Sequence, residues 1–319
     1  MSEITVRPIV VGRTIEPEEA GAKTAGQAVA EALLENALTP QDGDIIVVSS
    51  KVVSFFEGGL VRLGDVKPCW KARVLARAFG KDPRKLQILM ETGKVLLVVP
   101  MKRILRMPSM RRMMIERSAN PDAMIEGYSR INNFTFVVRV HAAYLDEAGI
   151  DHTNSPEGFV TVLPVDPCVV AERIRNELAE RFGIAVAVII TDTVTCVGRV
   201  GSQDIAIGFS GIDPVTRATF SDDLFGVPRS GGIDVVIDSI AGLAGLVMGQ
   251  TVERTPAVLI RGLSYAPQRE EDVARGMGIL GYPPGAQWRL VLYALAATAW
   301  FRIVNLFTLG RWPKRTRSI

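Results

Sequence analysis

Uninterrupted apolar runs and amphipathic stretches follow one another along most of the chain. The strongest run covers residues 185–190, and its Val and Ile residues are typical of a strand buried on both faces. Similar runs predict strands at 4–11, 45–48, 95–99 and 257–260. Alternation from residue 133 predicts a half-exposed strand, and one more short strand is expected within 202–215.

Periodic spacing of apolar residues predicts helices between these strands. Three helices are expected at 21–38, 67–79 and 169–183. A fourth is expected to begin at Asp82 and Pro83, and a fifth to contain Gly242, Gly245 and Gly249. Gly183 is well placed as a C-cap. A helix between two strands gives a βαβ-like unit, so the pattern predicts an α/β fold.

Polar residues that suit ligand binding follow several of the predicted strands. Asp192 follows the strongest apolar run, and open α/β sheets bind ligands at the carboxyl ends of their strands. Asp151 lies in a predicted loop, and Ser50 and Lys51 follow an earlier strand, where they suit a phosphate group. The alternatives are a turn or helix cap at Asp192 and a solvated lysine at Lys51.

Composition limits the class of protein. The chain has 319 residues, of which 48% are hydrophobic and 22% charged, enough for a substantial core. A net charge of +3 does not indicate nucleic-acid binding, and three scattered cysteines indicate neither a zinc site nor disulfides. The sequence has no P-loop, no dinucleotide fingerprint and no internal repeat. Its first residues lack the features of a secretory signal, so we expect a cytoplasmic protein.

Two segments differ from the rest of the chain. Residues 101–118 set basic side chains among Met and Leu, which suits anionic lipid or a polyanion, the alternative being a solvated helical face. Residues 288–310 are almost wholly apolar and precede a basic sequence. Three interpretations stay open there: a buried or dimer-interface helix, a peripheral membrane helix, or a span. Arg302 would cost a span about 2.5–3.5 kcal/mol at the bilayer centre.

Seven short motifs follow one another within residues 4–263. They are GDIIVVSSKVVSFFEG, EAGIDHTN, VLPVDP, ITDT with a following RVG, DIAIGFSGI, DDLFG and LVMGQTVERTPAVLIRGL. In this order and approximate spacing the chain resembles the coenzyme F420-0:gamma-glutamyl ligases. The resemblance predicts a ligase-like domain at 1–265, with a basic insertion at about 101–131, and an apolar helical extension at 266–319.

The resemblance implies a fold and a reaction. The family has a mixed α+β, two-lobed fold with mixed sheets and forms an intertwined homodimer. Its members join the amine of L-glutamate to a carboxylate of the deazaflavin coenzyme through an acyl phosphate, using GTP and a divalent metal ion. A carboxylate is a poor electrophile, so phosphoryl transfer must first activate it, and Mg²⁺ or Mn²⁺ must neutralise the triphosphate.

The resemblance also assigns site residues by motif. The implied metal ligands are Asp151, Asp192, Thr193 and Gln250. The implied nucleotide contacts are Ser50, Lys51, Asn154, Met248, Gly249 and Thr251. The last three belong to a loop along the guanine nucleotide, and no catalytic acid or base is implied.

Several positions depart from the family pattern. Phe55 stands where the family has a second lysine, and Ser239 stands where a glutamate would follow Asp238. The nucleotide loop near the amino terminus is reduced to residues 12–15. The family sequence Gly-Arg-Pro-Trp is replaced by Thr195, Cys196, Val197 and Gly198. The lost lysine and arginine remove positive charge, so the metal half of the site is kept while the phosphate and acceptor half is altered.

Three functions are consistent with these observations. The leading hypothesis is a metal- and nucleotide-dependent ligase that joins glutamate or a related amino acid to an acid such as F420-0. The second is a paralogue that ligates a different acid. The third is a catalytically silent, membrane-associated binding or scaffold protein. The expected partners are a small-molecule acid, an amino acid and a second copy of the chain, with no nucleic acid.

Overall fold

The computed structural model describes residues 3–127, 134–196, 199–283 and 285–307. The chain divides into two compact units, Met1–Ile279 and Leu280–Ile319. The second unit contains one long helix, α11 (Ala286–Phe307). Within the part of the chain that is described, no helix is long and apolar enough to cross a bilayer.

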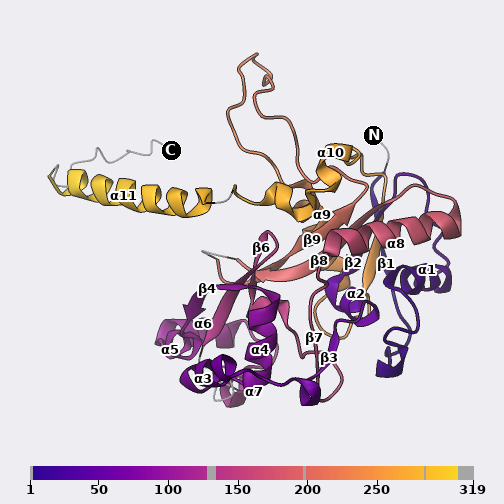
Figure 1. Ribbon diagram of the computed structural model, residues 1–319. Coiled ribbons are helices and arrows are strands. Elements are labelled where there is room, and N and C mark those ends of the chain that lie inside the picture. Colours follow the sequence, from indigo (N-terminus) through magenta and orange to yellow (C-terminus); the bar gives the residue numbers. More distant parts are fainter. Residues whose placement is uncertain (1–2, 128–133, 197–198, 284, 308–319) are drawn as a thin grey trace. The chain divides into compact units, whose positions relative to one another are not determined.

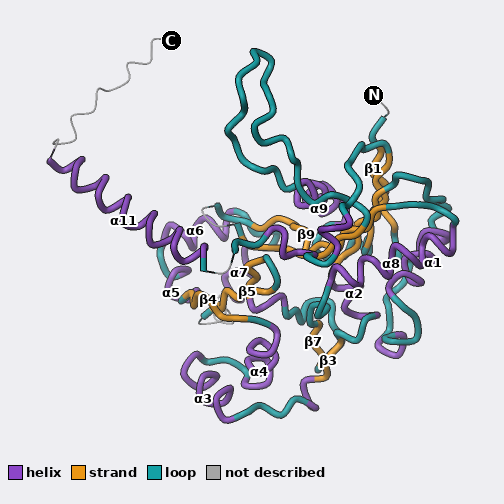
Figure 2. Tube along the Cα trace, turned by 45° about the horizontal axis from the view of Figure 1, so that its top comes forward, coloured by secondary structure: helices purple, strands orange, loops and turns teal. Residues whose placement is uncertain are grey.

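A five-stranded sheet forms the centre of the first unit (Figures 1 and 2). Its strands, in spatial order, are β1 (Thr5–Ile9), β10 (Ala257–Arg261), β2 (Ile45–Ser49), β8 (Ala187–Thr195) and β9 (Ser202–Ser210). β2 and β8 run parallel, and every other pair of neighbours is antiparallel. The predicted α/β fold with mixed sheets is therefore confirmed.

Helices cover both faces of this sheet. α8 (Pro167–Phe182) and α9 (Val236–Met248) lie against it, and α1 (Ala25–Glu35) packs beside α8. α1 and α8 share one core cluster with Ile46, Val48 and Val188. Ile45 and Val47 point to the opposite face, which α9 covers (Figure 1). Burial on both faces explains why the central strands are continuous apolar runs.

Caps fix several of the predicted helix ends. Thr24 accepts a hydrogen bond from the N–H of Gln27 at 3.2 Å and begins α1. Asp82 caps the helix that follows it, as predicted. Gly183 ends α8 in the left-handed conformation with φ 68°, so its predicted role as a C-cap is confirmed.

A smaller sheet is formed by the middle of the chain. Its strands, in order, are β4 (Lys94–Val99), β5 (Thr135–Val140) and β6 (Ala143–Asp146), and the helices near it are α3 (Trp70–Phe79) and α4 (Pro83–Thr92). β5 alternates in burial as predicted. The pattern that predicted a buried strand at 95–99 was wrong, because β4 is an edge strand whose Val95 and Leu97 are 37% and 57% exposed.

The predicted βαβ-like unit around α8 does not form within one sheet. The strand before α8 is β7 (Phe159–Thr161), which pairs with β3 (Leu60–Arg62) in a separate two-stranded sheet. The parallel neighbour of β8 is β2, from much earlier in the chain. A hydrophobic run predicts a strand but not the strand with which it pairs.

The remaining elements are short. The helices are α2 (Ser50–Phe56), α5 (Met101–Leu105), α6 (Pro108–Glu116), α7 (Pro121–Gly127) and α10 (Glu270–Val273). The 3-10 turns are at Pro17–Glu19, Leu63–Asp65, Glu147–Gly149 and Gly276–Leu280. The basic insertion contains α5 to α7. Residues 214–235, called the arm below, extend from the unit and are joined by isolated bridges (Figure 1).

Candidate functional site

Segments from distant parts of the chain surround one cavity of about 980 Å³. They come from residues 11–17, the junction of β2 and α2, the loop after β6, the facing parts of β8 and β9, and residues 248–256. All ten residues predicted to hold metal or nucleotide line it: Ser50, Lys51, Asp151, Asn154, Asp192, Thr193, Met248, Gly249, Gln250 and Thr251. The fold thus gathers the whole predicted set in one place.

Strand register puts Asp192 just beyond the end of the parallel pair. β2 ends at Ser49, which lies opposite Thr191, whereas β8 continues along β9 as far as Thr195. Asp192 therefore lies inside a strand, and the alternative of a turn or helix cap at this position was wrong. Beyond Thr191, β8 pairs with β9 alone, and this part of β8 carries Asp192 on the cavity wall.

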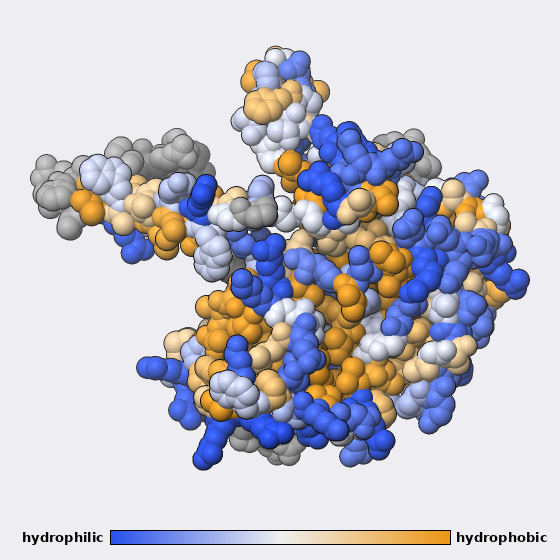
Figure 3. All heavy atoms as spheres, viewed as in Figure 1, coloured by the Kyte–Doolittle hydropathy of each residue, from blue (hydrophilic) through white to orange (hydrophobic). Residues whose placement is uncertain are grey.

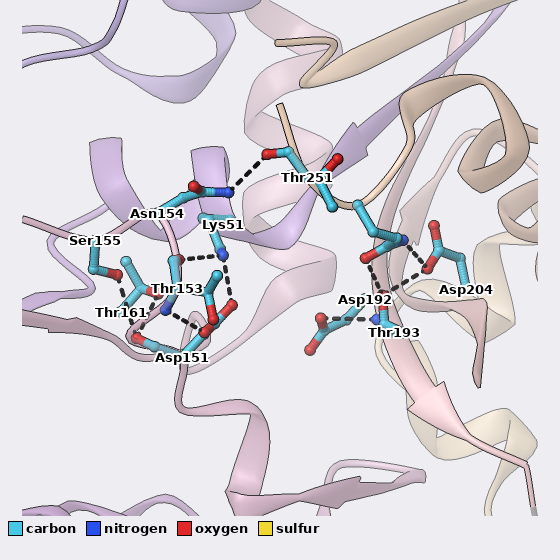
Figure 4. Close-up of polar contacts among 11 residues, drawn as sticks. Lys51, Asp151, Thr153, Asn154, Ser155, Thr161, Asp192, Thr193, Asp204 and Thr251 are labelled. Atoms are coloured by element: carbon cyan, nitrogen blue, oxygen red, sulfur yellow. Dashed lines mark hydrogen bonds and ion pairs between the residues drawn. The ribbon is translucent and has the colours of Figure 1, made fainter. Parts of the chain in front are cut away.

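Thr193, Asp204 and Gln250 form an oxygen cluster beside Asp192 (Figure 4). The Thr193 hydroxyl lies 2.7 Å from Asp204 Oδ1 and 3.1 Å from Gln250 Oε1, and Gln250 Nε2 donates to Asp204 Oδ1 at 3.1 Å. A hydroxyl has one proton and cannot donate to both acceptors. If the proton serves the shorter contact, two oxygen lone pairs face each other across 3.1 Å, an arrangement that favours a cation between them.

Asp192 lies between the oxygen cluster and the loop that carries Asp151 (Figure 4). Burial raises the pKa of Asp192 to about 6, and the negative charges of Asp204 and Asp151 act in the same direction. Hydrogen bonds from the N–H of Thr193, at 2.8 Å, and from Ser50 only partly offset this. A carboxyl group in this state is one that a nearby cation would ionise.

Lys51, Asp151 and Thr153 form a lysine cluster on the other side of the cavity (Figure 4). Lys51 Nζ donates to Asp151 Oδ2 at 2.5 Å and to the Thr153 carbonyl at 2.6 Å. The Thr153 N–H donates to Asp151 Oδ1 at 2.7 Å. Burial opposes the charge of Asp151, but these bonds outweigh it and hold the pKa of Asp151 below its usual value. Asp151 is compensated by a cation of the chain itself.

Carboxylates outnumber cations on the cavity wall. The acidic residues are Glu16, Asp146, Asp151, Asp192, Asp204 and Glu253, and the basic residues are Arg13, Lys51 and Arg254. Six carboxylates against three cations repel a polyphosphate unless further cations accompany it. Within the described ranges no three His, Cys, Asp or Glu side chains form a group that could hold a metal ion. A metal ion here would instead use carboxylate, hydroxyl and amide oxygens, which suit Mg²⁺ or Mn²⁺.

Asp204 lines the cavity and belongs to the oxygen cluster, although no sequence motif assigns it a role. It is 8% exposed and lies opposite Thr193 in the register of β8 and β9. Its carboxylate packs on α9 at Gly245, where an added Cβ would lie 2.1 Å from Asp204 Oδ2. A signal was available, because Asp204 opens the DIAIGFSGI motif. Its role depends on the strand pairing, which the motif does not reveal.

The loop after α9 is closed by one of its own side chains. The N–H and hydroxyl of Thr251 donate to the Glu253 carboxylate at 2.7 and 3.0 Å. Gly249 has φ +69°, and a Cβ there would lie 2.3 Å from the Glu253 side chain. Asn154 Nδ2 donates to the Thr251 carbonyl at 3.2 Å and so joins this loop to the lysine cluster. These contacts hold the loop that presents Gln250.

The shortened loop near the amino terminus also reaches the cavity wall. Arg13 forms an ion pair with Glu19 at 2.5 Å, and its hydrogen bond lowers the pKa of Glu19 to about 2. Arg254 Nη1 donates to the Gly12 carbonyl at 3.4 Å. Arg13 already has a carboxylate partner, which limits the charge that it offers to a ligand.

The other departures from the family pattern differ in position. Phe55 lines the cavity and is 8% exposed. Ser239 is exposed, hydrogen-bonds within α9 and is absent from the cavity wall. The Thr195 hydroxyl donates a hydrogen bond to Asp146 Oδ2, on the cavity wall, at 2.5 Å. Val197 and Gly198 lie outside the described residues. Of these changes, Phe55 is the one that alters the cavity wall directly.

Comparison with known proteins identifies a family and several relatives of this chain. The family described as F420-0:Gamma-glutamyl ligase matches residues 19–262, which include all ten predicted residues. A coenzyme F420:L-glutamate ligase of Methanopyrus kandleri is 31% identical over 281 residues, 88% of this chain and 95% of the relative. The protein of that name from Methanothermobacter thermautotrophicus is 33% identical, covering 72% and 79% of the two chains. The Archaeoglobus fulgidus protein is 32% identical, covering 78% and 91%. The chain therefore belongs to the F420-0:gamma-glutamyl ligase family.

Proposed function

We propose that this protein joins L-glutamate, or a related amino acid, to a carboxylate acceptor such as F420-0, with GTP as co-substrate and Mg²⁺ or Mn²⁺ as cofactor. Family membership supports the reaction class. The observation that carries the proposal is the arrangement of the cavity, where an oxygen cluster that pairs with no Lys or Arg of the described residues faces a lysine cluster. This arrangement suits an anionic nucleotide that enters together with a divalent cation.

The donor set on the oxygen side fits a hard divalent cation. Asp192, Thr193 and Gln250 would hold it through oxygen atoms, which Mg²⁺ and Mn²⁺ prefer. When bound, the ion would neutralise phosphate charge and polarise the phosphorus–oxygen bonds. Asp204 would act as a positioning residue, because it accepts hydrogen bonds from both Thr193 and Gln250 and so orients their remaining lone pairs.

Lys51 gives the proposal a link between nucleotide and metal. Its ammonium group donates a hydrogen bond to Asp151. A phosphate oxygen that takes over Lys51 would release the carboxylate of Asp151 toward the cavity, where a cation could use it. Ser50, Asn154 and Thr251 would contribute the polar contacts around the nucleotide. A hydrogen bond already joins Asn154 to Thr251. Nucleotide and metal would then bind cooperatively.

The proposed reaction has two steps. An oxygen of the acceptor carboxylate attacks the γ-phosphorus of GTP, the bond from that phosphorus to the bridging oxygen breaks, and GDP leaves with the electron pair. The amine of the amino acid then attacks the carbonyl carbon of the acyl phosphate. The carbon–oxygen bond to phosphate breaks, inorganic phosphate leaves, and the nitrogen loses a proton to give the amide. The chain's residues hold and orient these groups.

Phe55 favours a second candidate, a paralogue that ligates a different acid. It places an aromatic ring on the cavity wall where the family pattern has a lysine. An apolar ring cannot pair with an anionic group of the acceptor, so an acid with less negative charge would fit this wall better. The activation by GTP would be unchanged.

The experiment is a thermal-shift titration with GTP or ATP, with and without Mn²⁺, followed by product analysis. A ligand that binds only the folded state raises the unfolding temperature. We expect GTP with Mn²⁺ to stabilise the protein, and glutamate with F420-0 to release one GDP for each amide formed. Stabilisation without product from F420-0 favours the different acid. No stabilisation by either nucleotide overturns the proposal in favour of a silent binding or scaffold protein.

We also propose that the arm mediates association with a second copy of the chain. Leu224 and Phe225 near its tip are 99% and 88% exposed, whereas its base is held by Arg217, which pairs with buried Asp272 at 2.5 Å. A fixed base and an apolar tip suit a protein interface. Sedimentation equilibrium should give a dimer for the wild type and a monomer for Leu224→Asp. A monomeric wild type would overturn this assignment.

A further inference from the structure

α11 has apolar residues around most of its circumference, seen as orange and pale spheres along this helix in Figure 3. Several of its large side chains have more than half of their surface exposed: Trp288, Leu290, Leu292, Tyr293, Leu295, Trp300 and Phe301. A helix of this kind is stable in water only when something covers it. The question is which partner fits its shape and charge.

Apart from Arg289 in the first turn, which lies on the opposite side, the amide, threonine and charged side chains of α11 fall on one narrow stripe. At about 100° per residue, Gln287, Thr298, Arg302 and Asn305 fall within about 60° of one another around the helix axis. Three of the four, Thr298, Arg302 and Asn305, lie in the second half of the helix. A broad apolar face with a narrow polar stripe suits a helix that lies along the boundary between water and hydrocarbon.

Charge distinguishes the partners that could cover this face. Residues 280–319 contain no Asp or Glu and six basic residues: Arg289, Arg302, Arg311, Lys314, Arg315 and Arg317. A second copy of the segment would bring two sets of like charges together. A surface of anionic lipid headgroups is complementary instead. Trp288, Tyr293 and Trp300 are of the residue types that favour the headgroup region of a bilayer.

We propose that α11 binds the surface of a membrane that contains anionic lipids, with its axis along the surface. Its apolar face would enter the boundary of headgroups and acyl chains, its polar stripe would stay in water, and the basic residues of 280–319 would contact lipid phosphates and carboxylates. The segment lies beyond residues 19–262, which match the ligase family. The proposal therefore does not depend on the proposed reaction and gives the enzyme a place of action at a membrane.

The test uses the full chain and sedimentation with vesicles. The vesicles are phosphatidylcholine alone, or phosphatidylcholine with phosphatidylserine. We expect binding to the second kind, weakened by added salt because exposed charges are screened. A depth readout comes from tryptophan fluorescence in vesicles with brominated acyl chains, in a variant in which Trp70 and Trp312 are replaced by Phe, so that Trp288 and Trp300 are the tryptophans that remain. Their fluorescence should be quenched by the brominated chains, and fluorescence that is not quenched would overturn the proposal.

Two variants that each add one negative charge show whether vesicle binding depends on α11 or on another exposed part of the protein. Leu292→Glu places a carboxylate on the apolar face of α11 and should weaken vesicle binding on the order of tenfold or more. Val165→Glu is the matched control, because Val165 is 95% exposed in the first unit, and it should bind as the wild type does. Both proteins are checked by circular dichroism and thermal unfolding.

Each other outcome overturns the proposal. A wild-type protein that stays in the supernatant with both kinds of vesicle has no membrane surface on α11. Equal binding to both kinds, insensitive to salt, removes the role of anionic lipid. Loss of an oligomer in Leu292→Glu, with no vesicle binding by the wild type, assigns α11 to a second copy of the chain.

Discussion

The two sides of the cavity meet the same electrostatic problem in different ways. In the lysine cluster, Asp151 is paired with Lys51 at 2.5 Å and the pKa of Asp151 stays below its usual value. Across the cavity, the pKa of Asp192 is raised to about 6 by burial and by neighbouring carboxylates. Both groups line the same cavity, so the difference comes from their partners.

The difference indicates where an external cation is needed. The lysine cluster is complete within the chain, whereas the oxygen cluster and Asp192 hold carboxylate, hydroxyl and amide oxygens with too few protons between them. A side that carries its own cation suits the phosphates of a nucleotide, and a side that lacks one suits a metal ion. The following variants test this division.

The largest effect is expected for Asp192→Asn. The change keeps the shape of the side chain but removes the charge that a metal ion would use. We expect Mn²⁺-dependent nucleotide turnover to fall on the order of a thousandfold or more, because a ligand is lost from a site that must neutralise phosphate charge. Asp122→Asn, an exposed residue in the insertion, is a suitable control and should keep full turnover. Unchanged turnover in Asp192→Asn would remove this residue from the metal site.

The same variant changes the pH dependence of stability. Asp192 holds its proton more tightly in the folded protein, with a pKa of about 6, than in the unfolded chain, with an ordinary value of 3.8. Its contribution to the free energy of unfolding therefore falls as the pH rises from about 4 to about 6. At pH 7 and without metal, Asp192→Asn should be more stable than the wild type by up to ~3 kcal/mol. Urea unfolding of both proteins at pH 4 and pH 7 measures this difference. A free energy of unfolding that is the same for wild type and Asp192→Asn at pH 7 would contradict the prediction.

A smaller effect is expected for Asp204, which is proposed to position Thr193 and Gln250. Asp204→Ala removes the shared acceptor and should weaken Mn²⁺ binding about 10- to 100-fold, as for other partners of metal ligands. Asp204→Asn keeps one oxygen acceptor and should recover part of the affinity. Calorimetric titration with Mn²⁺ gives both values. Equal affinities for wild type and Asp204→Ala would show that Asp204 has no part in the site.

The smallest effect separates two glycines of α9. A Cβ at Gly245 would lie 2.1 Å from Asp204 Oδ2, whereas a Cβ at Gly242 has its nearest neighbour at 3.8 Å. Gly245→Ala should displace the Asp204 carboxylate and cost ~1–2 kcal/mol of stability. Gly242→Ala should be neutral or stabilise the helix by up to ~1 kcal/mol. Unfolding measurements and Mn²⁺ affinity should change together in Gly245→Ala, and similar behaviour of both variants would contradict the close approach.

The central strands and most helices could be predicted because their patterns are local. Continuous apolar runs gave β2, β8 and β10, and Asp82 and Gly183 marked helix ends by their capping chemistry. The edge position of β4 could not be predicted, because burial depends on what packs against a strand. The pairing of β8 with β2 was missed for the same reason, since it joins segments far apart in the chain.

The site shows the same limit. Motifs carried by the family resemblance gave ten residues of the cavity wall, because their types and order are visible in the sequence. Asp204 was passed over because its role arises from the register of β9 with Thr193 and from the space left by Gly245. The pairing of Lys51 with Asp151 joins the first turn of α2 to a loop one hundred residues further along the chain, which no local pattern indicates.

The most direct test of the division between the two sides is Mn²⁺ binding with and without GTP, followed by electron paramagnetic resonance of the free ion. We expect GTP to raise the affinity for Mn²⁺, because a phosphate that takes Lys51 releases Asp151. We also expect Asp192→Asn to lose the tight binding at pH 7. Mn²⁺ binding that is the same with and without GTP, and unchanged in Asp192→Asn, would contradict both expectations.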